Sequence, residues 1–186
     1  MVYKGKKFKF EKGKVINRGG NGIIYKVTTS DIEGNFVAKF LLKNKIKDKK
    51  TYERFLNEIN TVRKLCEEEM EGLIPVIDYH IPEEGDLNNK NDIPWYVMPY
   101  AKTFSASIFQ KTTNKKIEDM IKISEIICNL HKRGYTHRDI KIQNILIYKE
   151  KIKLADFGLV WHYDLDGLTG INESVGAKRT IAPEME

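Results

Sequence analysis

The sequence contains little cysteine and no long apolar run. Of its 186 residues only two are cysteines, Cys66 and Cys128, and they lie far apart without a Cys-x-x-Cys pattern. This excludes a disulfide framework and a zinc site of the usual spacing, so we expect a reducing, cytoplasmic environment. No apolar stretch reaches membrane-spanning length, and the lysine-rich start lacks the apolar core of a signal peptide. The sequence has no internal repeat, and it predicts a soluble chain with no membrane partner.

The overall composition is that of a folded, globular protein. Hydrophobic residues make up 41% of the chain and charged residues 31%, which excludes an intrinsically disordered protein. The net charge is +6, but the 32 basic and 26 acidic residues are interspersed. This excess suits an anionic ligand such as a nucleotide, although a solvated surface explains any single basic run, such as 43–50, equally well. The length allows one domain with a substantial core or two small lobes.

The first half of the chain shows mainly the pattern of strands. Apolar and polar residues alternate in the segments KVIN, GIIYKV and NFVAKFLL, which predicts a small antiparallel sheet. A helix is expected over 51–69, with its apolar side formed by Phe55, Ile59, Val62 and Cys66. LIPVIDYH (73–80) and WYVMPYA (95–101) read as two further strands. The polar insert between them, 81–92, is expected to be a mobile loop.

The second half begins with a helical pattern. Residues 117–132 predict a helix with a broad apolar side formed by Met120, Ile121, Ile123, Ile127 and Leu130. NILIYKE and KIKLADFG then predict a short hairpin, and 161–186 reads as a long loop. Residues 101–113 resemble a linker in composition. We therefore expect a sheet-rich first lobe and a helix-led second lobe.

Lys39 interrupts an apolar strand, FVAKFLL, where an unpaired charge would be costly. Glu58 lies on the apolar side of the first helix, because Phe55, Glu58 and Val62 are spaced three and four residues apart. A carboxylate that points into a core requires a cation. The sequence therefore predicts a Lys39–Glu58 ion pair, and a lysine held in this way can present its ammonium group to phosphate oxygens.

Three further segments carry groups suited to phosphate chemistry. In HRDIKIQNIL, Asp139, Lys141 and Asn144 crowd a short polar loop before an apolar strand. Asp156 follows a strand in ADFG, where a carboxylate can bind a hard cation such as Mg²⁺. The turn in INRGGNGIIYKV (16–27) is either a phosphate-binding loop or an ordinary hairpin turn. Taken singly, each of these segments is better explained by turn formation.

Together these segments resemble the eukaryotic-type (Hanks-type) serine/threonine protein kinase catalytic domain. The set comprises the glycine loop, Lys39, Glu58, HRDIKIQN, DFG and APE (182–184), and its order and spacing agree with that family. The resemblance implies an α+β, bilobal kinase-like fold with an antiparallel sheet and one helix in the first lobe and a partial set of helices in the second. Residues 1–100 would form the first lobe. Residues 101–186 would hold the hinge, catalytic loop and activation segment.

The resemblance also implies the role of each chemical residue. Family members bind ATP and Mg²⁺ and transfer the γ-phosphate to protein hydroxyl groups. Lys39, held by Glu58, is expected to contact the α/β-phosphates. Asp139 is expected to accept or orient the substrate hydroxyl, and Lys141 to neutralise the transferring phosphoryl group. The lysine two residues after the catalytic aspartate resembles the pattern of the serine/threonine class of the family.

The nucleotide and metal contacts follow from the same resemblance. Met98 matches the residue at the back of the adenine pocket, with 99–101 as the hinge. The full set of implied nucleotide contacts is Asn17, Gly19, Gly20, Gly22, Ile24, Val37, Lys39, Met98, Pro99 and Ala101. The implied Mg²⁺ ligands are Asn144 and Asp156.

Four positions depart from the family pattern. Asn17 replaces the first loop glycine, a mild change because asparagine tolerates unusual φ angles. Asn21 replaces an aromatic residue at the loop tip. Val37 stands where a smaller alanine usually covers the adenine, which predicts a tighter pocket. Ala177 replaces a threonine that usually helps to hold the catalytic aspartate and lysine, so it affects substrate alignment.

The activation segment offers one regulatory hypothesis. Arg138 matches the usual receiver of an activating phosphate in the family. The usual phosphosite position falls at Glu173, which we expect to supply part of that charge, with Ser174 as a neighbouring switch.

The sequence leaves alternatives open. A small-molecule phosphotransferase of related fold, or a non-catalytic ATP-binding scaffold, remains alongside the protein kinase interpretation. The expected partner is a protein substrate with serine or threonine, and no nucleic acid. The chain ends two residues after APE, where the family continues with further helices. We therefore expect a truncated domain that binds ATP with reduced transfer, and whose helix 117–132 exposes apolar side chains that favour self-association or another covering chain.

Overall fold

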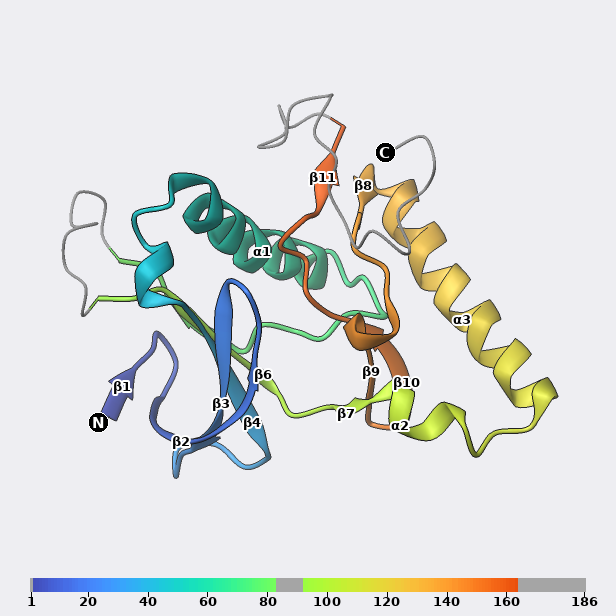
Figure 1. The fold of residues 1–186 in the computed structure, drawn as a ribbon, viewed down its shortest axis with the longest axis horizontal. Helices are drawn as coiled ribbons and strands as arrows, with labels where there is room; N and C mark the ends of the chain where they lie inside the picture. The colour runs from blue at the N-terminus through green and yellow to red at the C-terminus, as the bar shows by residue number, and fades with distance from the viewer. Residues whose placement is uncertain (1, 83–91, 164–186) are drawn as a thin grey trace. The chain divides into compact units, whose positions relative to one another are not determined.

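A computed structural model describes residues 2–82 and 92–163 of the chain. The chain divides into two compact units, one made of Met1–Arg63 and Pro75–Tyr100, the other of Lys64–Ile74 and Ala101–Glu186. The chain passes from one unit to the other after Arg63, Ile74 and Tyr100, so the segment 64–74 belongs to the second unit. The fold class expected from the sequence, an α+β kinase-like fold, is confirmed (Figure 1).

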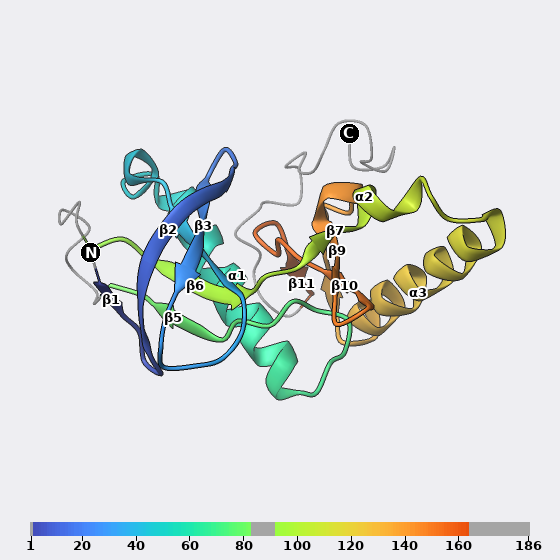
Figure 2. The ribbon, with the colours of Figure 1, turned by 90° about the horizontal axis from the view of Figure 1, so that it is seen from below.

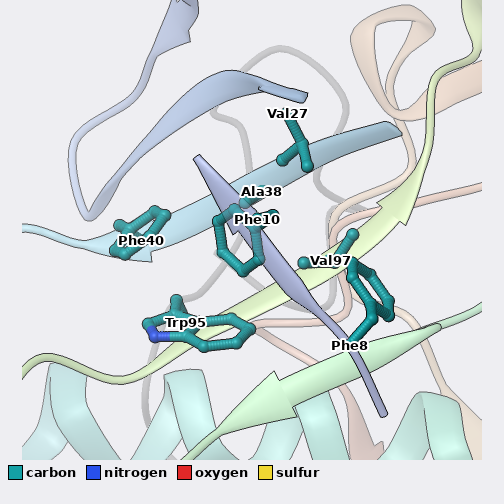
Figure 3. Close-up of a cluster of buried hydrophobic side chains, with 7 residues drawn as sticks. All are labelled: Phe8, Phe10, Val27, Ala38, Phe40, Trp95 and Val97. Atoms are coloured by element: carbon teal, nitrogen blue, oxygen red, sulfur yellow. The ribbon is translucent and has the colours of Figure 1, made fainter. Parts of the chain in front are cut away.

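The first unit is built on a six-stranded antiparallel sheet. Its strands follow the order β1-β2-β3-β4-β6-β5. They are β1 (Val2–Lys4), β2 (Lys9–Arg18), β3 (Gly22–Thr28), β4 (Phe36–Leu41), β5 (Asp78–His80) and β6 (Trp95–Pro99). One face of this sheet carries a buried apolar cluster (Figure 3), whose members are Phe8, Phe10, Val27, Ala38, Phe40, Trp95 and Val97. Alternation along β4 and β6 sends the other side chains of these strands to the opposite face.

Helix α1 (Lys49–Glu67) confirms the helix expected over 51–69. It begins where the Asp48 carboxylate accepts hydrogen bonds from the backbone N–H and the hydroxyl of Thr51, as an N-cap does. The predicted apolar side is buried at Phe55, Ile59 and Val62. The basic run 43–50, which the sequence analysis assigned to solvated surface, has local structure of its own. It contains the short helix η1 (Lys43–Lys45) and the buried Ile46.

The second unit combines one long helix with short strands. Helix α3 (Thr113–Lys132) packs beside β10 and β8 (Figures 1 and 2). The elements of this unit besides α3 are β7 (Lys102–Thr103), α2 (Phe104–Ile108), β8 (Tyr135–Thr136), η2 (Ile142–Asn144), β9 (Ile145–Tyr148), β10 (Lys151–Leu154) and β11 (Trp161–His162). A three-stranded sheet has the order β10-β9-β7, and β11 pairs with β8. The predicted hairpin is therefore present as β9 and β10.

Several expectations from the sequence were wrong. Residues 101–113 are not a linker, because β7 pairs with β9 and α2 buries Phe104. Only Asp78–His80 of the segment 73–80 forms a strand in the first sheet. Leu73 instead makes a parallel bridge to Leu154 of β10. The start of the expected terminal loop forms β11. Residues 83–91 of the insert 81–92 and residues 164–186 lie outside the described residues.

No helix in the described ranges is both long enough and apolar enough to span a lipid bilayer.

Candidate active site

Lys39 and Glu58 form the predicted ion pair within the first unit. The ammonium nitrogen Nζ of Lys39 lies 2.9 Å from each carboxylate oxygen of Glu58. The Lys39 side chain is 14% exposed and that of Glu58 is 4% exposed. β4 supplies the lysine and α1 the glutamate, from the helix face that also buries Phe55 and Val62. The pair is shielded from water, so its charges interact more strongly than a surface pair would.

Tyr96 is a member of this group that the sequence interpretation missed. Its hydroxyl donates a hydrogen bond of 2.8 Å to Oε1 of Glu58. Tyr96 lies directly opposite Lys39 in the pairing of β6 with β4. A buried tyrosine needs a partner for its hydroxyl. Its place in an apolar strand that pairs with the lysine strand is the signal that could have identified it.

The glycine turn joins β2 to β3. The N–H of Gly19 donates to the carbonyl of Gly22 across 2.9 Å. None of Gly19, Gly20 and Gly22 has a positive φ, so the turn does not need glycine for its backbone angles. A Cβ at Gly22 would lie 3.0 Å from the Phe40 carbonyl oxygen and 3.4 Å from Lys39 side-chain atoms, whereas a Cβ at Gly20 would meet nothing within 4 Å. Packing therefore explains Gly22 but not Gly20.

Several of the nucleotide contacts expected from the sequence share one face of the sheet. Residues directly opposite each other in antiparallel strands project to the same side. Ile24 lies opposite Lys39, and Val37 lies opposite Met98. Because Val37 and Lys39 are two residues apart on β4, all four side chains lie on the face that also carries Tyr96. Among the other members of the set, Asn17 pairs with Ile24, Pro99 pairs with Phe36 at the end of β6, and Ala101 is half-buried.

The catalytic-loop residues gather around one carboxylate in the second unit. Asp139 is 8% exposed. Nζ of Lys141 donates to Asp139 Oδ2 at 2.7 Å, and Nδ2 of Asn144 donates to the same oxygen and to the Asp139 carbonyl, each at 2.9 Å. The predicted crowding of these three side chains is confirmed. Because Asn144 turns its nitrogen toward Asp139, its amide oxygen points away from that carboxylate.

The β9–β10 hairpin brings Asp156 to the same end as Asn144. Ile145 pairs with Leu154, so the residues just outside the hairpin, Asn144 and Ala155, are neighbours. The Ala155 N–H donates to the Asn144 carbonyl at 2.9 Å. Asp156 follows immediately with a φ of 66°. A positive φ is uncommon for residues other than glycine, although aspartate adopts it more readily than most.

His137 and Phe157 support this loop from inside the unit. Both side chains are 1% exposed, and their ring centroids lie 4.6 Å apart. The N–H of Asp139 donates to Nδ1 of His137, so Nε2 carries the proton and donates to the Ala155 carbonyl at 3.2 Å. Burial lowers the pKa of His137 below its ordinary value. The sequence interpretation gave His137 no role, although HRD itself was the available signal.

Arg138 lies between His137 and Asp139 with a φ of 58°. Its Nε donates to the Leu159 carbonyl at 2.9 Å, which links the catalytic loop to the segment after DFG. The residues that it was predicted to serve, Glu173 and Ser174, lie outside the described residues. So do Ala177 and the APE segment 182–184.

The donor chemistry fits Mg²⁺. Asn144 and Asp156 supply an amide and a carboxylate oxygen, the hard ligands that this ion prefers. Within 2–82 and 92–163 there is no cluster of three or more histidine, cysteine or acidic side chains able to hold a metal. Mg²⁺ commonly binds one or two carboxylates together with substrate phosphates.

Several known proteins are similar to this chain in sequence. A probable serine/threonine-protein kinase of Clostridium perfringens is 27% identical over 183 residues, which cover 95% of this chain and 25% of that protein. A probable serine/threonine-protein kinase of Clostridium acetobutylicum is 25% identical over 175 residues, which cover 91% of this chain and 25% of that protein. Serine/threonine-protein kinase A of Synechocystis is 28% identical over 78% of this chain and 30% of that protein. The chain thus matches a quarter to a third of the length of these relatives.

The family comparison covers almost the entire chain. The model of the protein kinase domain matches residues 10–185, a range that contains the glycine turn, the Lys39–Glu58 pair, the catalytic loop and Asp156. The chain therefore belongs to the protein kinase family.

Proposed function

We propose that this chain is a serine/threonine protein kinase that transfers the γ-phosphate of ATP, with Mg²⁺, to protein hydroxyl groups. The observation that carries the proposal is the buried cluster in which Asp139 contacts both Lys141 and Asn144. An aspartate can accept a hydroxyl proton, and a lysine beside it can neutralise charge on a transferring phosphoryl group. The relatives' names as serine/threonine kinases support the same assignment.

In the proposed reaction, the hydroxyl oxygen of a substrate serine or threonine bonds to the γ-phosphorus of ATP. The bond between that phosphorus and the β,γ-bridging oxygen breaks, and ADP leaves with the electron pair. Asp139 orients the hydroxyl and takes its proton, while Lys141 and Lys39 stabilise the negative charge on the phosphates. Asn144 and Asp156 would hold Mg²⁺, which would supply further charge neutralisation at the phosphates.

Two features of the first unit support nucleotide binding. The glycine at position 20 has no explanation in its φ angle or its neighbours, and close approach of backbone to phosphate is a reason that remains. Ile24, Val37 and Met98 share a sheet face with Lys39, so an adenine on that face would place its phosphates toward the lysine. We infer that Asn17, Gly19, Gly22, Pro99 and Ala101 complete the nucleotide contacts.

The test is to incubate the chain with γ-labelled ATP, Mg²⁺ and a generic protein substrate. We expect label on serine and threonine of the protein. Label on a small-molecule acceptor but not on protein would indicate a phosphotransferase of another class. ATP binding without transfer would indicate a non-catalytic scaffold. Either result would overturn the proposal.

Partner proteins are a separate part of the proposal. Ile117, Met120 and Ile121 on α3 are 55%, 56% and 54% exposed, and Phe109 is 85% exposed. Ile117 lies three and four residues before Met120 and Ile121, so these three exposed apolar side chains share one face of α3, and such a face favours association. Self-association, or coverage by another chain, therefore stays a prediction that light scattering over a concentration series would test.

A further inference from the structure

The Lys39–Glu58 pair has a further hydrogen-bond donor on the neighbouring strand. Tyr96 of β6 lies opposite Lys39 of β4, so both side chains leave the sheet on the same face. The Tyr96 hydroxyl donates to Oε1 of Glu58 at 2.8 Å, while the Lys39 ammonium contacts both Oε1 and Oε2 at 2.9 Å. One carboxylate oxygen is thus shared by a phenol and an ammonium group.

Burial makes this shared oxygen important. Glu58 is 3% exposed and Tyr96 is 4% exposed, so water cannot substitute for a lost donor at little cost. A hydrogen bond to a buried charged group contributes more than one between neutral groups. Each donor also restricts the rotamers of Glu58, and the position of Glu58 determines where the Lys39 ammonium lies.

The aromatic packing fixes where the Tyr96 hydroxyl points. The ring of Phe55, one helical turn before Glu58 on α1, lies 5.7 Å from the Tyr96 ring. The Lys39 ammonium lies 5.8 Å from the Tyr96 centroid and 5.9 Å from that of Phe55. These distances allow cation–π attraction in addition to the ion pair. Tyr96 is therefore held by packing as well as by its hydroxyl.

We propose that Tyr96 is a positioning residue for phosphoryl transfer, which holds Glu58 and through it aims the Lys39 ammonium at the nucleotide phosphates. This inference rests on the proposed function of Lys39. The alternative is that Tyr96 has only a structural role. In that case Glu58 accepts the hydrogen bond of the buried Tyr96 hydroxyl, and catalysis does not depend on that hydroxyl. The two roles predict different kinetics for the same variant.

The kinetic test compares Tyr96→Phe with the wild type in the purified chain. The substitution removes one oxygen and leaves the ring packing in place. We expect kcat to fall about tenfold, equivalent to about 1.4 kcal/mol, while KM for ATP changes less than about twofold. Tyr79→Phe is the matched control, because Tyr79 lies opposite Tyr96 on β5 and its hydroxyl makes no described bond to the pair. An unchanged kcat in Tyr96→Phe would overturn the proposal.

A double-mutant cycle with Glu58→Gln tests whether Tyr96 acts through Glu58. We expect Tyr96→Phe to lower kcat and the denaturation midpoint less in the Glu58→Gln background than in the wild type. Equal losses in both backgrounds would contradict the proposal. The denaturation half of the cycle needs no activity. If the wild type transfers no phosphate, the proposed function fails, whereas absent coupling in the denaturation midpoints overturns the inference itself.

Discussion

His137 is buried, and its two ring nitrogens have different partners. Nδ1 accepts from the Asp139 N–H, and Nε2 faces the Ala155 carbonyl. A proton on both nitrogens would set the N–H of Asp139 against a ring N–H. Desolvation lowers the pKa of His137, against smaller raising contributions from the Ala155 hydrogen bond and from the nearby carboxylates of Asp156 and Asp139. The folded chain therefore holds His137 in its neutral form.

This protonation state predicts how stability depends on pH. Because the folded pKa is below the ordinary value of 6.5, the unfolded chain binds a proton that the folded chain does not. The contribution of neutral His137 to the free energy of unfolding is fully present above pH 6.5. It falls as the pH drops below 6.5, by at most about 1.4 kcal/mol per pH unit. Urea denaturation at pH 7.5 and 5.5 measures the change. His137→Gln should lose this part of the slope, whereas exposed His131→Gln should keep it. Equal slopes in all three proteins would contradict the assignment.

Asp156 combines a metal-binding carboxylate with a positive φ. Asn also tolerates this backbone region, so Asp156→Asn changes the charge with little backbone strain. We expect the variant to weaken ATP binding in the presence of Mg²⁺ more than in its absence. Calorimetric titration with Mg²⁺ and with EDTA gives both affinities. Equal losses under the two conditions would count against a metal role for Asp156.

At the scale of elements, Asp78 connects β5 to the turn between β1 and β2. Its carboxylate accepts from the backbone N–H groups of Lys6, Lys7 and Phe8 at 2.9, 3.0 and 3.2 Å, and it is 1% exposed. A Cβ on Gly5 would lie 1.9 Å from Oδ2 of Asp78. The turn therefore encloses the carboxylate closely.

Removing this carboxylate should destabilise the first unit. Asp78→Ala leaves the turn's N–H groups without their acceptor, and we expect a loss of about 2–4 kcal/mol in the free energy of unfolding. Gly5→Ala should also destabilise the wild type through its clash, but should cost less in the Asp78→Ala background, where the clashing atoms are absent. Chemical denaturation of the four proteins measures this. Additive losses would show that the Cβ at position 5 does not clash with the Asp78 carboxylate.

The glycine turn predicts a contrast between two neighbouring substitutions. Gly22→Ala should lower the free energy of unfolding by about 1–3 kcal/mol, because its Cβ meets the Phe40 carbonyl oxygen. Gly20→Ala should leave stability within about 0.5 kcal/mol of the wild type, yet weaken ATP binding. Denaturation and calorimetry on both variants test the contrast. Unchanged ATP affinity in Gly20→Ala would remove the support that this glycine gives to nucleotide binding.

Sequence patterns predicted the long elements better than the short ones. α1, α3 and the strands β2 to β4 have enough residues for their apolar periodicity to be read directly. The two-residue strands β7, β8 and β11 exist only because a partner strand lies beside them, and no local pattern records the partner. The segment 73–77 is apolar like a strand, but Pro75 lacks an N–H for a ladder and Leu73 bridges to Leu154 instead.

The candidate site shows the same division. The Lys39–Glu58 pair was predictable because each charge interrupts an apolar pattern. The hydrogen bond from Tyr96 and the tautomer of His137 were not, because both depend on side chains brought together from different elements. Motif order could indicate Asp139, Lys141 and Asn144, but only the structure shows that Lys141 and Asn144 both donate to the same Asp139 oxygen.

At the scale of the whole molecule, the central claim is phosphoryl transfer to protein. The first unit carries Lys39 and Glu58, and the second carries Asp139 and Asp156. A substitution that removes a catalytic charge in either unit should therefore abolish the same reaction. Lys39→Met and Asp139→Asn each remove a charge and replace the side chain with an uncharged one of similar size. Both variants should stay folded, as measured by circular dichroism.

The most direct measurement is the rate at which wild type, Lys39→Met and Asp139→Asn transfer labelled γ-phosphate to serine or threonine of one protein substrate. The account predicts transfer by the wild type and losses of at least about a hundredfold in both variants. Near-wild-type turnover in either folded variant, or no transfer by the wild type with Mg²⁺ and ATP present, would contradict it.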